Sequence, residues 1–105
     1  MYPRPVEVRP LGEYRLLVVF EDGVRAELDF TAMVEWGGVY EKLRDHECFA
    51  QARIDNEAES LAWPGEVDIC PDVLYHLATG APLPGELPRQ AAAVVRVDRD
   101  VARVS

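Results

Sequence analysis

The strongest local signals in the chain lie in Trp63-Pro64-Gly65-Glu66-Val67-Asp68-Ile69-Cys70-Pro71-Asp72-Val73-Leu74-Tyr75. The Pro64-Gly65 pair ends a strand, because proline cannot donate a hydrogen bond to a ladder and glycine permits the turn. Pro71 suits the first position of a helix, where the Asp72 carboxylate meets the positive helix end. The stretch therefore predicts a strand that ends at Trp63, and a helix from residue 71 to 78 or 79 that is capped by Gly80.

The first 30 residues predict three antiparallel strands that follow one another. Residues 6–9 alternate apolar and charged side chains between two prolines, which is typical of a short strand near a sheet edge. Residues 14–20 are apolar on both faces, which favours a central strand. Asp22-Gly23 is a strong hairpin signal, and residues 24–30 alternate cleanly after it. This part of the chain is therefore expected to form a meander.

Residues 31–63 predict short helices and a second hairpin. Thr31 is a candidate cap for a helical turn over residues 32–35, which Gly37-Gly38 would end. The remaining expected elements are a helix over about residues 39–45, a strand over 49–55 and a strand over 60–63. The predicted fold class is therefore α+β, with a small antiparallel sheet of about five strands and two or three short helices.

The predicted domain covers residues 1–80, and the remainder is predicted to be a linker and a tail. Residues 81–88 contain three prolines and predict an extended linker. Residues 90–105 combine an alanine run, which favours helix, with a valine-rich run, which favours strand. An extra strand, a tail that docks on a partner and a disordered tail all fit this pattern.

The charge of the chain limits its partners. The net charge is −8, and residues 1–80 hold 16 acidic and 7 basic residues. An acidic body repels phosphate backbones, so we expect no direct nucleic-acid binding, whereas a basic protein would be attracted. Apolar runs such as Leu16 to Phe20 are too short to span a membrane, and no secretory signal is visible. A cytoplasmic protein is expected.

The sequence predicts no catalytic residues, metal or cofactor. The only histidines are His46, which lies in a charged stretch and is expected to be exposed, and His76, for which a pairing with Cys70 is awkward along the intervening helix. Asp68, Cys70, Asp72 and His76 could in principle gather around a metal ion. We favour a surface ion pair or a helix-end contact for Asp72 and His76, because metal sites show tighter ligand pairs.

Four residues are candidates for contact with a partner or ligand: Trp36, Trp63, Asp68 and Tyr75. A tryptophan beside a loop can anchor an interface, although one that is buried over a small sheet is the more common case. Asp68 could hold the turn before the helix through backbone N–H groups or face a partner. A pocket lined by Trp36, Trp63 and Tyr75 would instead indicate a small-ligand-binding regulatory domain.

Three further features occur in a characteristic order. Residues 18–23 lead to Leu28-Asp29-Phe30, Leu43-Arg44-Asp45 is followed by Phe49, and the stretch 63–75 comes last. Over residues 5–80 the chain resembles the small bacterial family of unknown function numbered 2442 (DUF2442). The resemblance implies a small α+β domain and provides no catalytic residues to transfer.

The resemblance also implies a partner. Some relatives carry a downstream helix-turn-helix domain, for which residues 81–105 are too short. Relatives are often encoded beside another small protein, in an arrangement similar to toxin–antitoxin pairs. We therefore expect a non-catalytic protein-interaction domain, an antitoxin-like partner of a small basic protein. Its tail could add a strand to a partner's sheet or to a second copy of the chain, so a homodimer is a further expectation.

Overall fold

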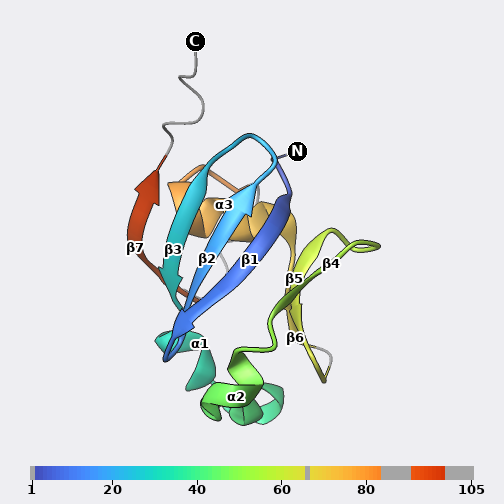
Figure 1. The fold of residues 1–105 in the computed structure, drawn as a ribbon, viewed down its shortest axis with the longest axis vertical. Coiled ribbons are helices and arrows are strands. Elements are labelled where there is room, and N and C mark those ends of the chain that lie inside the picture. The colour runs from blue at the N-terminus through green and yellow to red at the C-terminus, as the bar shows by residue number, and fades with distance from the viewer. Residues whose placement is uncertain (1, 66, 84–90, 99–105) are drawn as a thin grey trace.

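A computed structural model describes residues 2–65, 67–83 and 91–98 of the chain (Figure 1). The elements follow in the order β1 (Pro5–Gly12), β2 (Arg15–Phe20), β3 (Arg25–Asp29), α1 (Thr31–Val34), the 3-10 helix η1 (Gly38–Arg44), α2 (His46–Phe49), β4 (Arg53–Asp55), β5 (Ser60–Trp63), β6 (Val67–Ile69), α3 (Pro71–Thr79) and β7 (Ala93–Asp98). The α+β class expected from the sequence is confirmed.

The larger sheet has the strand order β1-β2-β3-β7, with each neighbouring pair antiparallel. The predicted meander forms its first three strands. At the β2–β3 turn, Gly23 adopts a φ of 94° and its N–H donates to the Phe20 carbonyl at 2.9 Å. The Asp22 carboxylate accepts the Val24 N–H at 3.1 Å, which closes the turn locally. The hairpin forms because Asp and Gly suit this backbone geometry.

A second, smaller sheet has the strand order β4-β5-β6. The structure thus divides seven described strands between two sheets, where about five strands in one sheet were expected. Of the two additional strands, β7 comes from the tail, where an extra strand was one of the outcomes left open, and β6 was not expected because residues 67–69 were interpreted as an apolar turn. These three residues instead pair with β5, so that Val67 lies opposite Trp63 and Ile69 opposite Leu61.

The helical connection between β3 and β4 departs from the predicted bounds. Phe30, not Thr31, occupies the cap position of α1, and the Asp29 carboxylate accepts both the N–H and the hydroxyl of Thr31. The chain forms α2 from His46 to Phe49, so the strand expected from residue 49 begins only at Arg53. The Asp45 carboxylate explains this start, because it accepts the Glu47 N–H at 3.0 Å.

The helix α3 matches its prediction and lies across one face of the larger sheet (Figure 1). Pro71 occupies its first turn, and Gly80 caps its C-terminal end with a φ of 78°. The Tyr75 ring packs edge-on against Phe20 of β2, with 5.0 Å between the ring centroids. Leu74 and Ala78 are also buried. The helix therefore covers the apolar face of the sheet.

Replacing Gly80 with alanine should lower the free energy of unfolding by about 1 kcal/mol, because a side chain disfavours the left-handed backbone. A Cβ atom at this position would meet no atom within 4 Å, so steric contact adds nothing to the loss. Urea unfolding would measure the change. Asparagine, which tolerates this conformation better, should be less harmful than alanine, and equal losses for both would contradict the argument.

The core joins the two sheets, α3 and the helical end of the molecule. Its largest fully buried side chains are aromatic: Trp63, Phe20, Phe30 and Phe49. The Trp63 indole N–H donates to the Phe49 carbonyl at 2.9 Å, and its ring lies against both Phe30 and Phe49. Trp63 therefore connects the smaller sheet to the helical connection.

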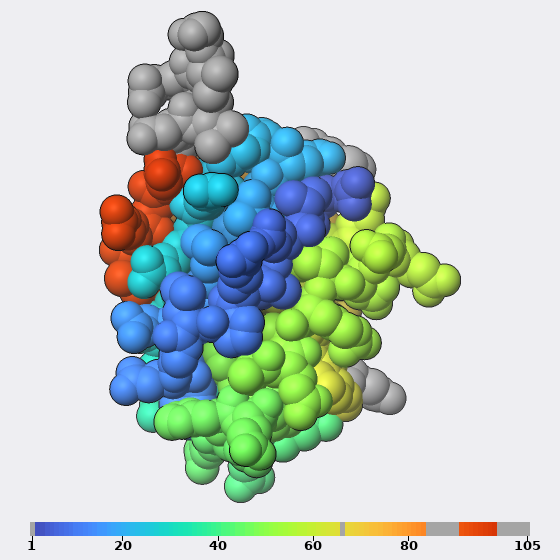
Figure 2. All heavy atoms as spheres, in the orientation of Figure 1, coloured from blue at the N-terminus to red at the C-terminus, as the bar shows by residue number. Residues whose placement is uncertain are grey.

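Residues 93–98 form β7 beside β3, so this part of the tail adds a strand to the larger sheet. Among the three outcomes left open for residues 90–105, the extra strand is the one that the described part adopts. The predicted linker covers residues 81–88, and most of it, residues 84–88, lies outside the described residues, as do residues 89–90 and 99–105. In Figure 2, β7 forms one lateral border of the molecule next to β3.

Candidate functional site

A small hollow lies where α1, η1, β6 and α3 meet, and it is named here the Trp36 pocket. Its volume is about 180 Å³. Apolar side chains dominate its lining, with one carboxylate among them: Met33, Trp36, Tyr40, Asp68, Ile69, Cys70, Val73 and Ala91. The pocket thus combines segments that are far apart in the sequence.

Two aromatic rings form one wall of the Trp36 pocket. The Trp36 and Tyr40 rings meet edge to face, with 5.0 Å between their centroids. The backbone N–H of Trp36 donates to the Met33 carbonyl at 3.1 Å, which fixes the position of this residue directly after α1. Gly37 then adopts a φ of 82°, and its carbonyl accepts the Tyr40 N–H at 3.1 Å. The glycine turn therefore sets the relation between the two rings.

Asp68 of β6 is one of the residues that line the Trp36 pocket. In β6 the side chains of Val67 and Ile69 are buried, and Asp68 between them is exposed. Asp68 belongs to this strand, opposite Ala62, and not to the turn in which it was expected to hold backbone N–H groups. Among the described residues it belongs to none of the ion pairs.

The other two candidate contacts lie elsewhere. Trp63 is 1% exposed and belongs to the core. Tyr75 is half-buried on α3, and its hydroxyl donates to the Asp22 carboxylate at 2.7 Å. Its ring also stacks on Tyr2, with 5.3 Å between the ring centroids. The structure thus brings Trp36 and Asp68 together and places Trp63 and Tyr75 away from the Trp36 pocket.

Tyr40 and Val73 are pocket residues that sequence reasoning did not single out. Tyr40 follows Trp36 by four residues across the glycine pair, which is a weak signal for two rings at one site. Val73 belongs to α3 and is half-buried there. Its position at the pocket depends on how α3 packs beside β6, and the local pattern does not contain that information.

Two of the four residues considered for a metal site, Asp72 and His76, are engaged in separate contacts. The Asp72 carboxylate accepts the Tyr2 N–H at 3.1 Å, and the His76 Nδ1 atom lies 2.6 Å from the Ala81 carbonyl oxygen. Within the described ranges, no three His, Cys, Asp or Glu side chains gather closely enough to hold a metal ion. Cys48 and Cys70 are both free thiols.

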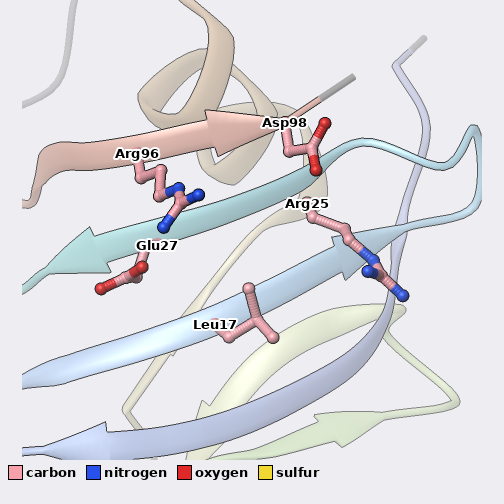
Figure 3. A pocket seen from close by; sticks show the side chains of 5 residues that line it. All are labelled: Leu17, Arg25, Glu27, Arg96 and Asp98. Carbon is pink, nitrogen blue, oxygen red and sulfur yellow. The ribbon is translucent and has the colours of Figure 1, made fainter. Parts of the chain in front are cut away.

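A second hollow of about 190 Å³ lies on the outward face of the larger sheet (Figure 3). Charged side chains of both signs from β3 and β7 stand around Leu17 of β2. They are Arg25, Glu27, Arg96 and Asp98. In the register of the sheet, Arg96 lies opposite Glu27 and Asp98 opposite Arg25. Opposite charges therefore face each other across these two strands.

Residues 5–80 match the model of the family described as "Protein of unknown function (DUF2442)". The chain belongs to the DUF2442 family. The match confirms the resemblance seen in the sequence and covers every element from β1 to α3, whereas β7 lies beyond it. Searches of curated proteins and of solved structures returned no match for this DUF2442 chain. No helix in its described part is long and apolar enough to cross a membrane.

Proposed function

We propose that this DUF2442 chain is a non-catalytic protein-interaction domain whose Trp36 pocket receives a lysine or arginine side chain of a basic partner protein. The observation that carries the proposal is the pairing of an aromatic wall, Trp36 and Tyr40, with the exposed carboxylate of Asp68. A cation is attracted to the face of an indole or phenol ring, and a carboxylate pairs with the same cation. The apolar part of the pocket suits the methylene stem of such a side chain.

The size of the Trp36 pocket favours one side chain over a whole metabolite. Its volume of about 180 Å³ lies below the roughly 300–1,000 Å³ that is usual for small-molecule sites. This comparison weakens the alternative of a small-ligand-binding regulatory domain. An interface commonly rests on a few aromatic anchors in such hollows, surrounded by contacts that exclude water.

The charge of the chain supports a basic partner. A net charge of −8 on 105 residues raises the rate at which an oppositely charged protein meets the surface. An antitoxin-like role beside a small basic protein would use both the long-range attraction and the local anchor. The same role would place the complex in the cytoplasm.

Replacing Asp68 with asparagine tests the proposal with little change in shape. The host's co-purifying partner, once isolated, would be titrated into the wild-type chain and the variant by calorimetry. We expect the variant to bind roughly fivefold more weakly, as expected when an exposed ion pair of about 1 kcal/mol is lost.

The matched control is Glu57→Gln, which removes the same charge from an exposed side chain in the turn between β4 and β5. This variant should bind as the wild type does, apart from a small general effect on the association rate. If Glu57→Gln weakened binding as much as Asp68→Asn does, the loss would be explained by the change in net charge and not by a contact of Asp68. If Asp68→Asn bound the partner as tightly as the wild type does, the Asp68 carboxylate would take no part in binding.

A further inference from the structure

The outward face of the larger sheet is the face that α3 does not cover (Figure 1). Odd-numbered residues of β2 and β3 point to this face, because even-numbered positions hold the buried residues Leu16, Val18, Ala26 and Leu28. Leu17 therefore projects from the middle strands of the face, where it is half-buried. The hollow of about 190 Å³ that it lines is named here the Leu17 hollow.

The two carboxylates of the Leu17 hollow are already engaged. A carboxylate oxygen of Glu27 lies 4.0 Å from a guanidinium nitrogen of Arg15, which stands on the same face of the sheet. Asp98 takes part in an interaction within its own chain. Neither carboxylate therefore requires a ligand to balance its charge.

The two arginines of the hollow are not engaged in this way. Within the part of the chain that the structure describes, neither Arg25 nor Arg96 belongs to an ion pair or donates a side-chain hydrogen bond. Together with Arg15, three guanidinium groups stand at this site against the two carboxylates of Glu27 and Asp98. The local charge is therefore positive, although the chain as a whole carries a net charge of −8.

The register of β3 and β7 brings the two arginines within reach of one ligand. Arg25 lies opposite Asp98 and Arg96 lies opposite Glu27, so the arginines are diagonal neighbours on adjacent strands. Diagonal positions are about 7–8 Å apart, a separation that long side chains can bridge. Figure 3 shows Arg25 and Arg96 on either side of the Leu17 side chain. Both guanidinium groups can therefore close on a single anion beside Leu17.

A β-bulge in β7 determines the orientation of Arg96. Glu27 pairs with Arg96 and Leu28 pairs with Val94, so Val95 is an extra residue in the strand. An unbroken alternation would place Val94 and Arg96 on the same face of the sheet. The bulge instead sets Val94 opposite the buried Leu28 and keeps Arg96 on the outward face. Bulges often lie beside functional sites, where they redirect a side chain.

We propose that the Leu17 hollow binds a carboxylate carried on a short aliphatic stem. Arg25 and Arg96 would donate charge-assisted hydrogen bonds to the carboxylate, and Leu17 would contact the methylene groups of the stem. Glu27 and Asp98 disfavour a phosphate group, because they repel its higher negative charge more strongly. The volume of the hollow suits one side chain or a small acid. Two sources supply such a group: a glutamate side chain of another protein, and a free carboxylic acid.

This site goes beyond the proposed function and does not rest on it. No residue lines both the Leu17 hollow and the Trp36 pocket, so the loss of one leaves the other in place. Arg96 also lies beyond the residues that match the family model, which end at residue 80. The complete site therefore needs the strand that the tail adds to the sheet.

The test is an NMR titration of the isotope-labelled full chain with butyrate. We expect the Leu17 methyl signals and the side-chain N–H signals of Arg25 and Arg96 to shift and to saturate at millimolar concentrations. Butylammonium, which has the same stem and the opposite charge, should leave them in place. A terminally blocked alanine–glutamate–alanine peptide distinguishes the two sources. Tighter binding than butyrate would assign the site to a glutamate side chain of a partner, and weaker binding would assign it to a free acid.

Two variants and a matched control complete the test. Arg25→Gln and Arg96→Gln each remove one guanidinium group and should weaken butyrate binding roughly fivefold, as for the loss of an exposed ion pair. Arg53→Gln removes an exposed arginine from β4 of the smaller sheet and should bind butyrate as the wild type does. A folded wild-type chain without saturable shifts would overturn the proposal. Equal weakening by Arg53→Gln, or phosphate binding as tight as that of butyrate, would also overturn it, because either result indicates general attraction of anions.

Discussion

Trp63→Ala should lower the free energy of unfolding by about 3–5 kcal/mol, the usual range when a large aromatic side chain is removed from a core. Trp63 is 1% exposed and packs against both Phe30 and Phe49. The substitution also leaves the Phe49 carbonyl without the indole N–H that it accepts at 2.9 Å. Since small domains are stable by about 5–15 kcal/mol, much of the stability would be lost. Urea unfolding followed by circular dichroism measures the change.

Two comparison variants separate the causes of this loss. Trp63→Phe keeps an aromatic ring and removes the hydrogen bond, so it should cost less than the alanine variant. Trp36→Ala removes the same side chain from a half-buried position and should cost clearly less than Trp63→Ala. If the two alanine variants were equally destabilised, Trp63 would not have the core role described here.

Trp36→Ala should weaken binding of the basic partner by about 2 kcal/mol or more, which corresponds to roughly thirtyfold in the dissociation constant. The substitution removes one of the two rings that form the wall of the Trp36 pocket, and with it the face on which a cation can rest. Titration calorimetry with the purified partner measures the loss. The variant must first show the circular dichroism spectrum of the wild type.

The control for this prediction is Val39→Ala on η1. Val39 is 56% exposed and does not line the Trp36 pocket, so its removal tests whether any exposed apolar side chain near the helical end matters. It should leave the affinity unchanged within about twofold. Comparable losses for both variants would point to a diffuse surface and against a single anchor.

The elements that were predictable carry their signals locally. The β2–β3 hairpin follows from Asp22-Gly23 between two apolar runs, and α3 follows from Pro71 at its start and Gly80 at its end. The division into two sheets was not predictable in this way. β6 has three residues, which is too short for a convincing alternation, and its pairing with β5 becomes clear only once the turn at Pro64-Gly65 is seen to close a hairpin.

The candidate site was predictable only in part, because its residues come together through tertiary packing. Trp36 and Asp68 were singled out from local context, but their sequence separation gave no reason to place them side by side. The two tryptophans also looked alike, each followed by a glycine-containing turn. Burial separates them, and the burial of Trp63 depends on aromatic partners in other segments. The pairing of β7 with β3 depended in the same way on contacts distant in sequence.

The indole N–H resonances of Trp36 and Trp63 provide the most direct test of the central claim, because each of the chain's two tryptophans gives one signal. The isotope-labelled chain would be titrated with the purified basic partner and followed by two-dimensional NMR. The account predicts a large shift of the Trp36 indole signal and of the Asp68 amide, while the buried Trp63 indole signal stays in place. Saturation of the chain by the partner with the Trp36 and Asp68 signals unmoved would contradict it.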